Sequence, residues 1–181
     1  MNTKPTALPG VLLITPRKFS DSRGAFWETY NEKILSDAGL PTSWKQDNTS
    51  VSIKNVVRGI HYQITQPQGK LVRVTYGAVY DVAVDLRRSS PTFGKHVGYE
   101  LSEDNGAMLW IPVGFGHAFA VLSARAGFAY KVTDYYSPAG ERTILWNDPA
   151  LAIKWPVAQD NAIVSGKDQQ GSHLAEAEVF A

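Results

Sequence analysis

From about residue 70 onward, apolar and polar residues alternate with a period of two over several short segments. Residues 71–76 turn at Gly77 into residues 78–86, and further strands are predicted at 98–101, 107–111, 118–122 and 128–134. Successive side chains of a strand point to opposite faces. In 78–86, Asp81 and Asp85 therefore share one face, and the other carries Tyr80, Val82, Val84 and Leu86. Many short strands with turns between them predict an antiparallel sandwich or barrel.

The first 45 residues are less regular. An apolar run at 11–15 ends at Pro16, and a turn at 21–24 leads into another short strand. Ile34, Leu35 and Ala38 have helical spacing, so we expect a brief helix that ends at Gly39. No linker, repeat or low-complexity tract interrupts residues 1–181, which predicts one domain. Residues 170–181 are compatible with either a loose tail or a small helix.

Composition narrows the functional classes. The 18 Lys and Arg residues against 17 Asp and Glu argue against a nucleic-acid binder that works through a basic field. The most apolar stretch, 108–122, contains Pro112 and His117 and is shorter than the ~20 residues that a membrane span needs. The N-terminus lacks the apolar core of a signal peptide. We expect a cytoplasmic protein that binds neither nucleic acid nor membrane. The absence of Cys excludes a disulfide scaffold, a thiolate nucleophile and an iron–sulfur site.

Residues 106–117 have the form G-x5-P-x-G-x2-H, which resembles the second sequence motif of the cupins, small double-stranded β-helix barrels. A strand, a Pro-Gly turn and a second strand would aim His117 into the barrel mouth. Metal-binding cupins add a first motif with two His, whereas residues 59–63 offer only His61. Because a catalytic metal usually takes three protein ligands, and His96 and His173 lie in unrelated contexts, we predict a metal-free cupin.

His61 lies in a segment rich in polar residues. On its own, His61 is equally well explained as a half-buried strand histidine with local hydrogen bonds. Arg58 and Lys70 are close in sequence, but strict alternation places Arg58 and His61 on opposite faces. Gly59 could allow a bulge that brings both side chains to one face.

The segment 128–136 has a polar-aromatic face. Period two places on it Phe128, Tyr130, Val132, Asp134 and Tyr136. Such a face inside a barrel suits a sugar or a nucleobase, which needs flat apolar contact and hydroxyl partners. An amphipathic outer strand explains the same pattern equally well.

Eight segments between about residues 10 and 170 together resemble the dTDP-4-dehydrorhamnose 3,5-epimerase family, in unchanged order. They are residues 21–28 (DSRGAFWE), 46–48 (QDN), 58–63 (RGIHYQ), 69–74 (GKLVRV), 81–87 (DVAVDLR), 110–117 (WIPVGFGH), 130–136 (YKVTDYY) and 146–149 (WNDP). The resemblance implies an all-β fold, a cupin-type double-stranded β-helix or jelly-roll barrel. It also implies an isomerase that needs no metal, nicotinamide or flavin.

The family epimerises a dTDP-linked 4-keto-6-deoxy sugar at C3 and C5, in dTDP-L-rhamnose biosynthesis. Inversion needs a base on one face of the ring, a proton donor on the other and a stabilising group at the enolate oxygen. By resemblance these are His61, Tyr130 and Lys70, with Asp168 as the partner of the histidine. Without the resemblance, Asp168 would be read as a solvated loop residue.

The resemblance also implies a binding set. Arg23, Arg58 and Lys167 would hold the diphosphate and sugar, and Gln46, Asp47 and Asn48 would contact the nucleotide. Glu28 and Glu141 would be polar contacts, His117 a neutral hydrogen-bonding group and Tyr136 a stacking partner of the thymine. Strands in residues 10–30 would cross to a second subunit, so that Arg23, Phe26 and Glu28 complete the partner's site in a homodimer.

Three other functions fit part of this pattern. A mono-epimerase would invert only C3 or only C5, and the residues do not decide between one carbon and two. A non-catalytic sugar-nucleotide-binding cupin would not need both His61 and Tyr130. A metal-dependent cupin oxygenase or isomerase would carry stoichiometric metal. The sugar's expected destination includes lipopolysaccharide O-antigen.

Overall fold

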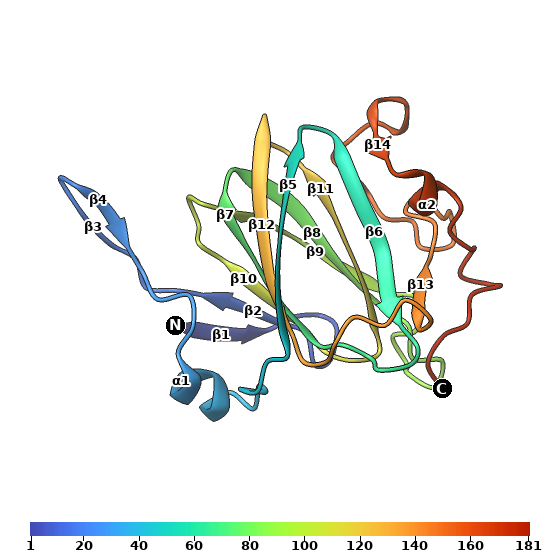
Figure 1. Cartoon of the computed structure of the whole chain (residues 1–181), viewed down its shortest axis with the longest axis horizontal. Coiled ribbons are helices and arrows are strands. Elements are labelled where there is room, and N and C mark those ends of the chain that lie inside the picture. Colours follow the sequence, from blue (N-terminus) through green and yellow to red (C-terminus); the bar gives the residue numbers. More distant parts are fainter.

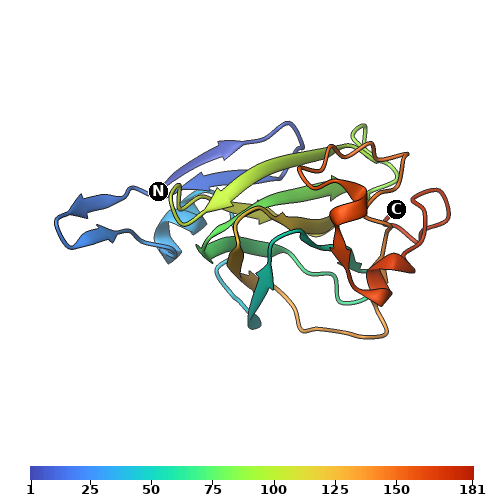
Figure 2. The same cartoon turned by 90° about the horizontal axis from the view of Figure 1, so that it is seen from above.

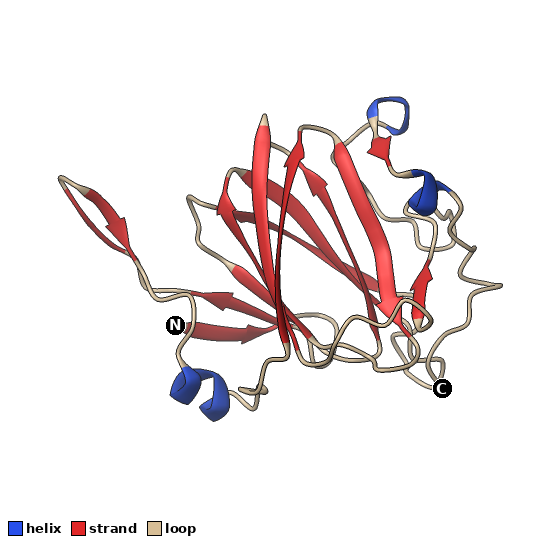
Figure 3. Cartoon of the chain, in the orientation of Figure 1, coloured by secondary structure: helices blue, strands red, loops and turns tan.

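The computed structural model describes all 181 residues, and strands dominate it (Figure 3). The strands are β1 (Asn2–Pro5), β2 (Leu12–Thr15), β3 (Phe19–Asp21), β4 (Gly24–Phe26), β5 (Gln46–Ile53), β6 (Val56–Gln63), β7 (Lys70–Tyr76), β8 (Ala78–Asp85), β9 (His96–Ser102), β10 (Met108–Ile111), β11 (Phe115–Val121), β12 (Arg125–Val132), β13 (Glu141–Thr143) and β14 (Ile163–Val164). The helices are α1 (Glu32–Asp37), α2 (Gly166–Gln169) and the 3₁₀ turn η1 (Gln159–Asn161). Neither α-helix is long and apolar enough to span a bilayer.

Two main sheets form a sandwich. The first has the strand order β1-β2-β10-β7-β12-β5, and the second has the order β13-β6-β11-β8-β9, with β14 added parallel to β6. The other neighbours within these sheets pair antiparallel, and the sheets lie face to face (Figures 1 and 2). The all-β cupin-type jelly roll predicted from the sequence is confirmed.

The main hydrophobic core fills the space between the two sheets. Val72 and Phe128 of the first sheet meet Phe119 of the second there. Strand β8 shows the predicted alternation, because Val79 and Ala83 belong to this core. The opposite face of β8 belongs to a second cluster under the C-terminal segment, and it carries Tyr80, Val82, Val84 and Leu86. Asp81 and Asp85 therefore point to the inner face of their sheet, and both are fully buried.

The brief helix predicted from the sequence is α1, and it ends just before Gly39 as predicted. The Asn31 side chain caps it by accepting a hydrogen bond from the backbone N–H of Ile34. Leu35 is buried against the first sheet, in a cluster with Leu71 and Trp110. Gly39, with φ +76°, lets the chain leave the helix in a left-handed conformation that other residues disfavour.

The C-terminal residues 171–181 form neither a loose tail nor a helix. They run along the second sheet in turns, and Leu174 and Ala177 are buried in the cluster below them. The Tyr62 hydroxyl donates a hydrogen bond to the carbonyl of Glu178, and Asp148 accepts one from the backbone N–H of Leu174. Long-range contacts, which a local pattern does not encode, hold this segment in place.

The hairpin of β3 and β4 projects away from the sandwich (Figures 1 and 2). Phe19 and Phe26 on it are 53% and 68% exposed. Strand β2, by contrast, pairs with β1 and β10 in the chain's own sheet. The sequence predicted that strands in residues 10–30 cross to a second subunit. Within that range, the residues of the hairpin extend beyond the two main sheets.

Strand β6 carries a bulge at Gly59. Across the β6–β11 pair, His61 lies opposite His117 and Arg58 lies opposite Phe119. Two residues of β6 therefore face the single residue Ala118 of β11 between these pairs, so Arg58 and His61 come to the same side. The bulge that the sequence allowed is confirmed. Gly59 has φ +115°, and a Cβ atom on it would lie 2.5 Å from the Cβ of Ala118.

We predict that Gly59→Ala destabilises the fold by about 2–4 kcal/mol, because the strained backbone and the overpacked Cβ atom each contribute. The measurement is the free energy of unfolding in urea. Gly39→Ala is the matched control, since φ is also positive there but no atom lies within 4 Å of the added Cβ. An equal loss in both variants would contradict the packing argument.

Candidate active site

A cavity of about 300 Å³ opens between the two sheets. Its lining combines residues of both sheets, namely Asn48, Thr49 and Ser50 of β5, Arg58 and His61 of β6, Lys70 of β7, His117 and Phe119 of β11, and Tyr130 of β12. An adjoining cavity of about 240 Å³ shares Asn48, His61, Lys70 and Tyr130 with it and reaches Gln46, Tyr136 and Glu141. The sandwich thus gathers side chains from five strands around one polar space.

His61, which lines this cavity, forms a hydrogen-bonded pair with Asp168 behind it. The Nε2 atom of His61 lies 2.6 Å from Oδ1 of Asp168, and the backbone N–H of Gly59 donates to Oδ2 at 3.2 Å. The Asp168 side chain is 3% exposed. Burial by itself would raise the pKa of Asp168, but the hydrogen bonds from His61 and Gly59 hold that pKa below its ordinary value. Since a carboxylate only accepts, Nε2 of His61 carries the proton and Nδ1 is left as the basic nitrogen.

A local cap positions Asp168. Ser165 precedes α2 and its hydroxyl accepts a hydrogen bond from the backbone N–H of Asp168 at 3.2 Å. Asp168 is therefore fixed in the short helix α2 and is no solvated loop residue.

Lys70 is the first residue of β7 in the first sheet, whereas His61 lies on β6 in the second sheet. Its ammonium group lies 3.4 Å from the carbonyl oxygen of His61. Burial lowers the pKa of Lys70 to about 8, although Asp81 and Glu141 oppose the shift through their negative charges. Lys70 remains a cation at neutral pH, close to the point at which it would lose its proton.

Tyr130 projects into the cavity from β12. Its ring packs against Phe128 of the core at a centroid distance of 6.1 Å. Burial raises the pKa of Tyr130, and the positive charge of Arg58 opposes this shift. The phenol therefore keeps its proton at neutral pH and can donate it. Because β12 belongs to the first sheet and β6 to the second, Tyr130 and His61 approach the cavity from different walls.

His117 forms a second imidazole–carboxylate pair. Its Nε2 atom lies 2.8 Å from Oδ2 of Asp81, which is fully buried on β8. Burial lowers the pKa of His117, and the attraction to Asp81 offsets only part of this shift. The strand, turn and strand predicted for residues 106–117 are confirmed as β10, the turn at Gly114 and β11.

A network of polar side chains surrounds the outer cavity. Glu141 of β13 accepts a hydrogen bond from the Tyr136 hydroxyl at 2.7 Å and forms an ion pair with Lys167 at 2.5 Å. Burial would raise the pKa of Glu141, but these two partners hold it below its ordinary value. Gln46 contacts Asn48 and accepts a hydrogen bond from the backbone N–H of Tyr136. Gln46, Tyr136 and Glu141, which are far apart or in different segments of the sequence, therefore meet at one end of the cavity.

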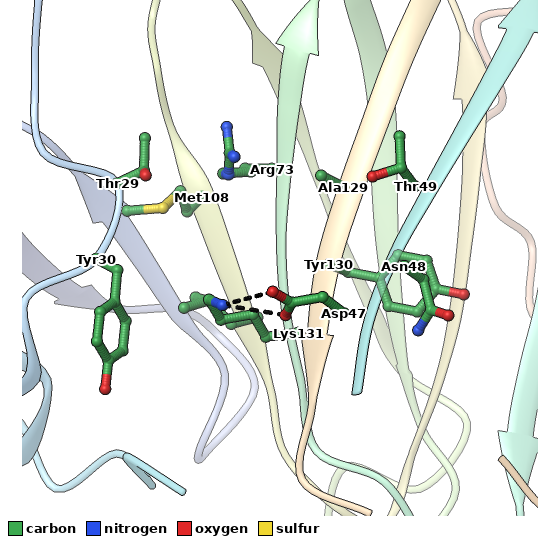
Figure 4. Close-up of a pocket in the computed structure, with 11 residues that line it drawn as sticks. Thr29, Tyr30, Asp47, Asn48, Thr49, Arg73, Met108, Ala129, Tyr130 and Lys131 are labelled. Carbon is green, nitrogen blue, oxygen red and sulfur yellow. Dashed lines mark hydrogen bonds and ion pairs between the residues drawn. The ribbon is translucent and has the colours of Figure 1, made fainter. Parts of the chain in front are cut away.

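Asp47 does not face this cavity. It lies on the other face of β5, where it forms an ion pair with Lys131 at 2.8 Å (Figure 4). Tyr30 faces Lys131 across that neighbouring cavity, at 5.6 Å from the ring centroid. The alternation of the strand explains the difference, because the neighbours Gln46 and Asn48 point inward.

The structure also leaves Arg23, Phe26 and Glu28 outside the cavity of their own chain. Arg23 is at the tip of the β3–β4 hairpin, where its side chain is 87% exposed and pairs with Asp21. Glu28 accepts a hydrogen bond from Asn31. None of the three lines either cavity described above.

No group of three or more His, Cys, Asp or Glu side chains comes together in a way that could hold a metal ion. Sequence reasoning missed the lining residues Thr49, Ser50 and Phe119, and it missed Asp81, which pairs with the lining residue His117. The alternation of β8 had placed this carboxylate on the same face as Val79 and Ala83, which the structure buries. A charged residue on a buried face needs a partner, and this signal could have suggested His117.

The arrangement can move protons. An imidazole backed by a carboxylate can remove a proton, a protonated phenol on the other wall can return one, and an ammonium group beside them can stabilise an oxyanion. These are the parts required to invert a carbon next to a ketone.

Comparison with known proteins gives a consistent result. A family model described as dTDP-4-dehydrorhamnose 3,5-epimerase matches residues 5–176. The chain is 55% identical to the dTDP-4-dehydrorhamnose 3,5-epimerase of Pseudomonas aeruginosa, with 96% of each chain covered. It is 39% identical to the dTDP-4-dehydrorhamnose 3-epimerase of Streptomyces niveus, with 98% of this chain and 86% of that one covered.

A solved structure is similar over nearly the whole chain. It is the dTDP-6-deoxy-D-glucose-3,5-epimerase of Legionella pneumophila, crystallised in complex with dTDP-4-keto-L-rhamnose. The TM-score is 0.94 and the sequences are 46% identical, with 98% of this chain and 94% of that chain covered.

The depressed pKa of Asp168 makes its contribution to stability depend on pH. The carboxylate form is favoured in the folded state, so this contribution is present above the unfolded pKa near 3.8 and is lost as pH falls through the lower folded value. We predict that Asp168→Asn costs about 1–3 kcal/mol of unfolding free energy at pH 7. The difference from the unsubstituted protein should shrink as pH is lowered from 5 to 3, measured by denaturant titration.

Asp104→Asn is the control, because no hydrogen bond or ion pair involves the exposed Asp104 side chain. It should be neutral at every pH. A loss in Asp168→Asn that stays constant down to pH 3 would show that the hydrogen bonds to a charged carboxylate are not its cause.

Proposed function

This chain belongs to the dTDP-4-dehydrorhamnose 3,5-epimerase family, and we propose that the cavity between its two sheets is the epimerase active site. The protein is an isomerase that converts dTDP-4-dehydro-6-deoxy-D-glucose to dTDP-4-dehydro-L-rhamnose, in dTDP-L-rhamnose biosynthesis. One observation supports the site most strongly: the His61–Asp168 pair and the Tyr130 phenol enter one cavity from different sheets.

The first step assigned to this site is proton abstraction by His61. The hydrogens at C3 and C5 are acidic because the C4 ketone delocalises the resulting carbanion into an enolate. Nδ1 of His61 takes the proton, and the charge of Asp168 stabilises the imidazolium that forms. Asp168 also keeps the ring in the tautomer that exposes Nδ1.

The second step is reprotonation from the opposite face. Lys70 stabilises the enolate oxygen while the carbanion exists, since a buried cation acts strongly where water is excluded. Tyr130 then donates its phenolic proton to the other face of the carbon. The configuration of the carbon is inverted because the new proton arrives on the face opposite to the one that lost its proton. The base and the proton donor therefore have to lie on opposite sides of the sugar ring.

The remaining predicted residues suit the nucleotide diphosphate. Arg58 and Lys167 bring positive charge to the phosphate oxygens, and the half-exposed Tyr136 offers its ring to the thymine. Gln46, Asn48 and Glu141 supply hydrogen bonds at the same end of the cavity.

The homodimer is part of this proposal. The projecting hairpin exposes Phe19 and Phe26 and carries Arg23 at its tip, which supports a role against another molecule. The hairpin of each subunit would deliver Arg23 and Phe26 to the partner's cavity, together with Glu28 just after it, while each chain remains one domain. Independence from metal and cofactor, a cytoplasmic location, and supply of O-antigen stay predictions.

Hydrogen exchange with solvent tests the proposed site. In deuterated water, we expect the protein to introduce deuterium at C3 and C5 of the 4-keto sugar nucleotide, followed by NMR. His61→Ala should lower exchange at both carbons by ~10²–10⁴-fold, because the base is missing. Tyr130→Phe should retain exchange but lose inversion, because His61 can return a deuteron only to the face from which it removed the proton.

Two control variants accompany this experiment. His173→Ala and Tyr135→Phe change the same residue types outside the cavity and should leave exchange and inversion unchanged. Full epimerisation by His61→Ala would require another base. Label at C3 alone in the unsubstituted protein would favour the mono-epimerase, the activity named for the Streptomyces relative.

The lowered pKa of Lys70 predicts how kcat/KM changes on the basic side of its pH profile. With a pKa of about 8, Lys70 is charged below that pH and becomes neutral above it, so kcat/KM should fall as pH rises past about 8. Lys70→Met should have a low activity, ~10²-fold down, without this limb. Measurement of kcat/KM from pH 6 to 10 checks both.

Lys33→Met changes an exposed lysine of α1 and should keep the wild-type profile. If the limb near pH 8 persisted in Lys70→Met, another group would have to cause it.

A further inference from the structure

The ring of Tyr136, which is proposed to stack on the thymine, is not enclosed by its own chain. Tyr136 is 52% exposed and lies in the irregular segment between β12 and β13. The one hydrogen bond of its side chain runs from the hydroxyl to Glu141. A ring with so little packing takes its direction mainly from the backbone that carries it. The groups that fix the backbone at Tyr136 therefore set the place of the stacking surface.

One side-chain amide bonds to the peptide units on both sides of Tyr136. Nε2 of Gln63 donates to the carbonyl oxygen of Tyr135 at 3.2 Å, and Oε1 of Gln63 accepts from the backbone N–H of Ser137 at 3.0 Å. Gln46 accepts a hydrogen bond from the N–H of Tyr136 itself. The two peptide units meet at the Cα atom of Tyr136. Because each unit is planar, fixing both restricts φ and ψ of this residue.

The Gln63 amide is itself held firmly. Gln63 is 5% exposed, and Nε2 donates a second hydrogen bond to the carbonyl oxygen of Gln66 at 2.7 Å. Its partners are two carbonyl oxygens on the nitrogen side and one N–H on the oxygen side, which leaves only one orientation for the amide. The amide thus ties β6 and the turn after it to the segment that carries Tyr136.

Strand β6 also connects this amide to the proposed base. His61 and Gln63 are two positions apart on β6, so their side chains leave the strand on the same face. Both residues line the adjoining cavity of about 240 Å³, and Tyr136 lines it as well. One strand therefore carries the base and holds the stacking surface.

We propose that Gln63 is a positioning residue for nucleotide binding, which holds the peptide units around Tyr136 so that the ring is in place before the thymine arrives. This inference rests on the proposed function. A segment that is mobile without ligand has to be ordered on binding, and this ordering lowers affinity. Gln63 removes that cost, so its effect falls on binding of the nucleotide and not on the proton transfers.

The first test requires no substrate and follows hydrogen exchange of the Ser137 backbone N–H by NMR. Gln63→Met removes the three hydrogen bonds but keeps an unbranched side chain of similar length. The Ser137 N–H should become ~10-fold less protected. The amides of β8, which has a neighbouring strand on each side, should keep their protection and report an intact fold. Equal protection of Ser137 in both proteins would overturn the proposal.

The second test compares the binding of dTDP and inorganic pyrophosphate by calorimetric titration. In Gln63→Met, the affinity for dTDP should fall ~10-fold, because the stacking surface is no longer fixed. Pyrophosphate has no base to stack, so its affinity should stay the same. An equal loss for both ligands would contradict the proposal, because Gln63 would then act on the phosphate contacts.

A double-mutant cycle shows whether Gln63 acts through Tyr136. With Tyr136→Ala there is no ring to position, so adding Gln63→Met should lower the affinity for dTDP no further. Additive losses would remove Tyr136 from the proposal and so overturn it. Gln159→Met, on the exposed turn η1, is the matched control and should bind both ligands like the unsubstituted protein.

A second variant keeps the test open if Gln63→Met does not fold. Gln63→Glu preserves the volume and the acceptor for Ser137, but its carboxylate has no N–H for the carbonyl oxygen of Tyr135. We expect it to lose affinity for dTDP and to retain affinity for pyrophosphate. Unchanged binding of dTDP by Gln63→Glu would overturn the proposal.

Turnover separates this role from a general structural one. Gln63→Met should raise KM for the sugar nucleotide ~10-fold with little change in kcat, because His61 and Tyr130 stay in place. A fall in kcat at unchanged KM would contradict the proposal. If the unsubstituted protein binds dTDP but exchanges no hydrogen at C3 or C5, the proposed catalysis fails and the binding results still decide on Gln63. If it does not bind dTDP, both proposals fail.

Discussion

The hydrogen bond between His61 and Asp168 is the contact on which the rest of the site depends. It joins a strand in the middle of the second sheet to a four-residue helix near the C-terminus, 107 positions later. Two further contacts hold the carboxylate, from the backbone of Gly59 and from the cap at Ser165. A buried anion persists only with such partners. The contacts of Asp168 join α2 to β6.

Charge balance governs the rest of the cavity. Lys70 is buried, and the negative charges of Asp81 and Glu141 keep its pKa from falling further than about 8. Asp81 in turn pairs with His117, and Glu141 pairs with Lys167. The cavity therefore holds cations, anions and neutral donors in a fixed arrangement. Because these dipoles and charges are in place before a substrate enters, little reorganisation is needed when an enolate forms.

The jelly roll suits this chemistry because it supplies two facing walls. A base and a proton donor for an inversion have to approach one carbon from opposite directions, and here β6 and β12 belong to different sheets. The bulge at Gly59 then adds Arg58 to the wall that carries His61. The hairpin of β3 and β4 projects away from both sheets, and Phe26 on it is exposed.

The alternating pattern predicted β7 to β12 and the faces of β8, because burial on one side of a strand is a local, period-two property. The ordered motifs predicted the family, and with it His61, Tyr130 and Lys70. Local patterns could not predict that the C-terminal residues pack on the second sheet, or that Asp81 meets His117. Those outcomes depend on which strands become neighbours, and residues far apart in the chain meet only once both sheets have closed over a shared core. The sequence by itself determined strands β7 to β12, the family and, through the family, the pairing of His61 with Asp168, because these depend on local alternation and on ordered motifs. Only the tertiary structure decided that His117 receives Asp81, because that pairing requires β8 and β11 to become neighbours in the closed sheet.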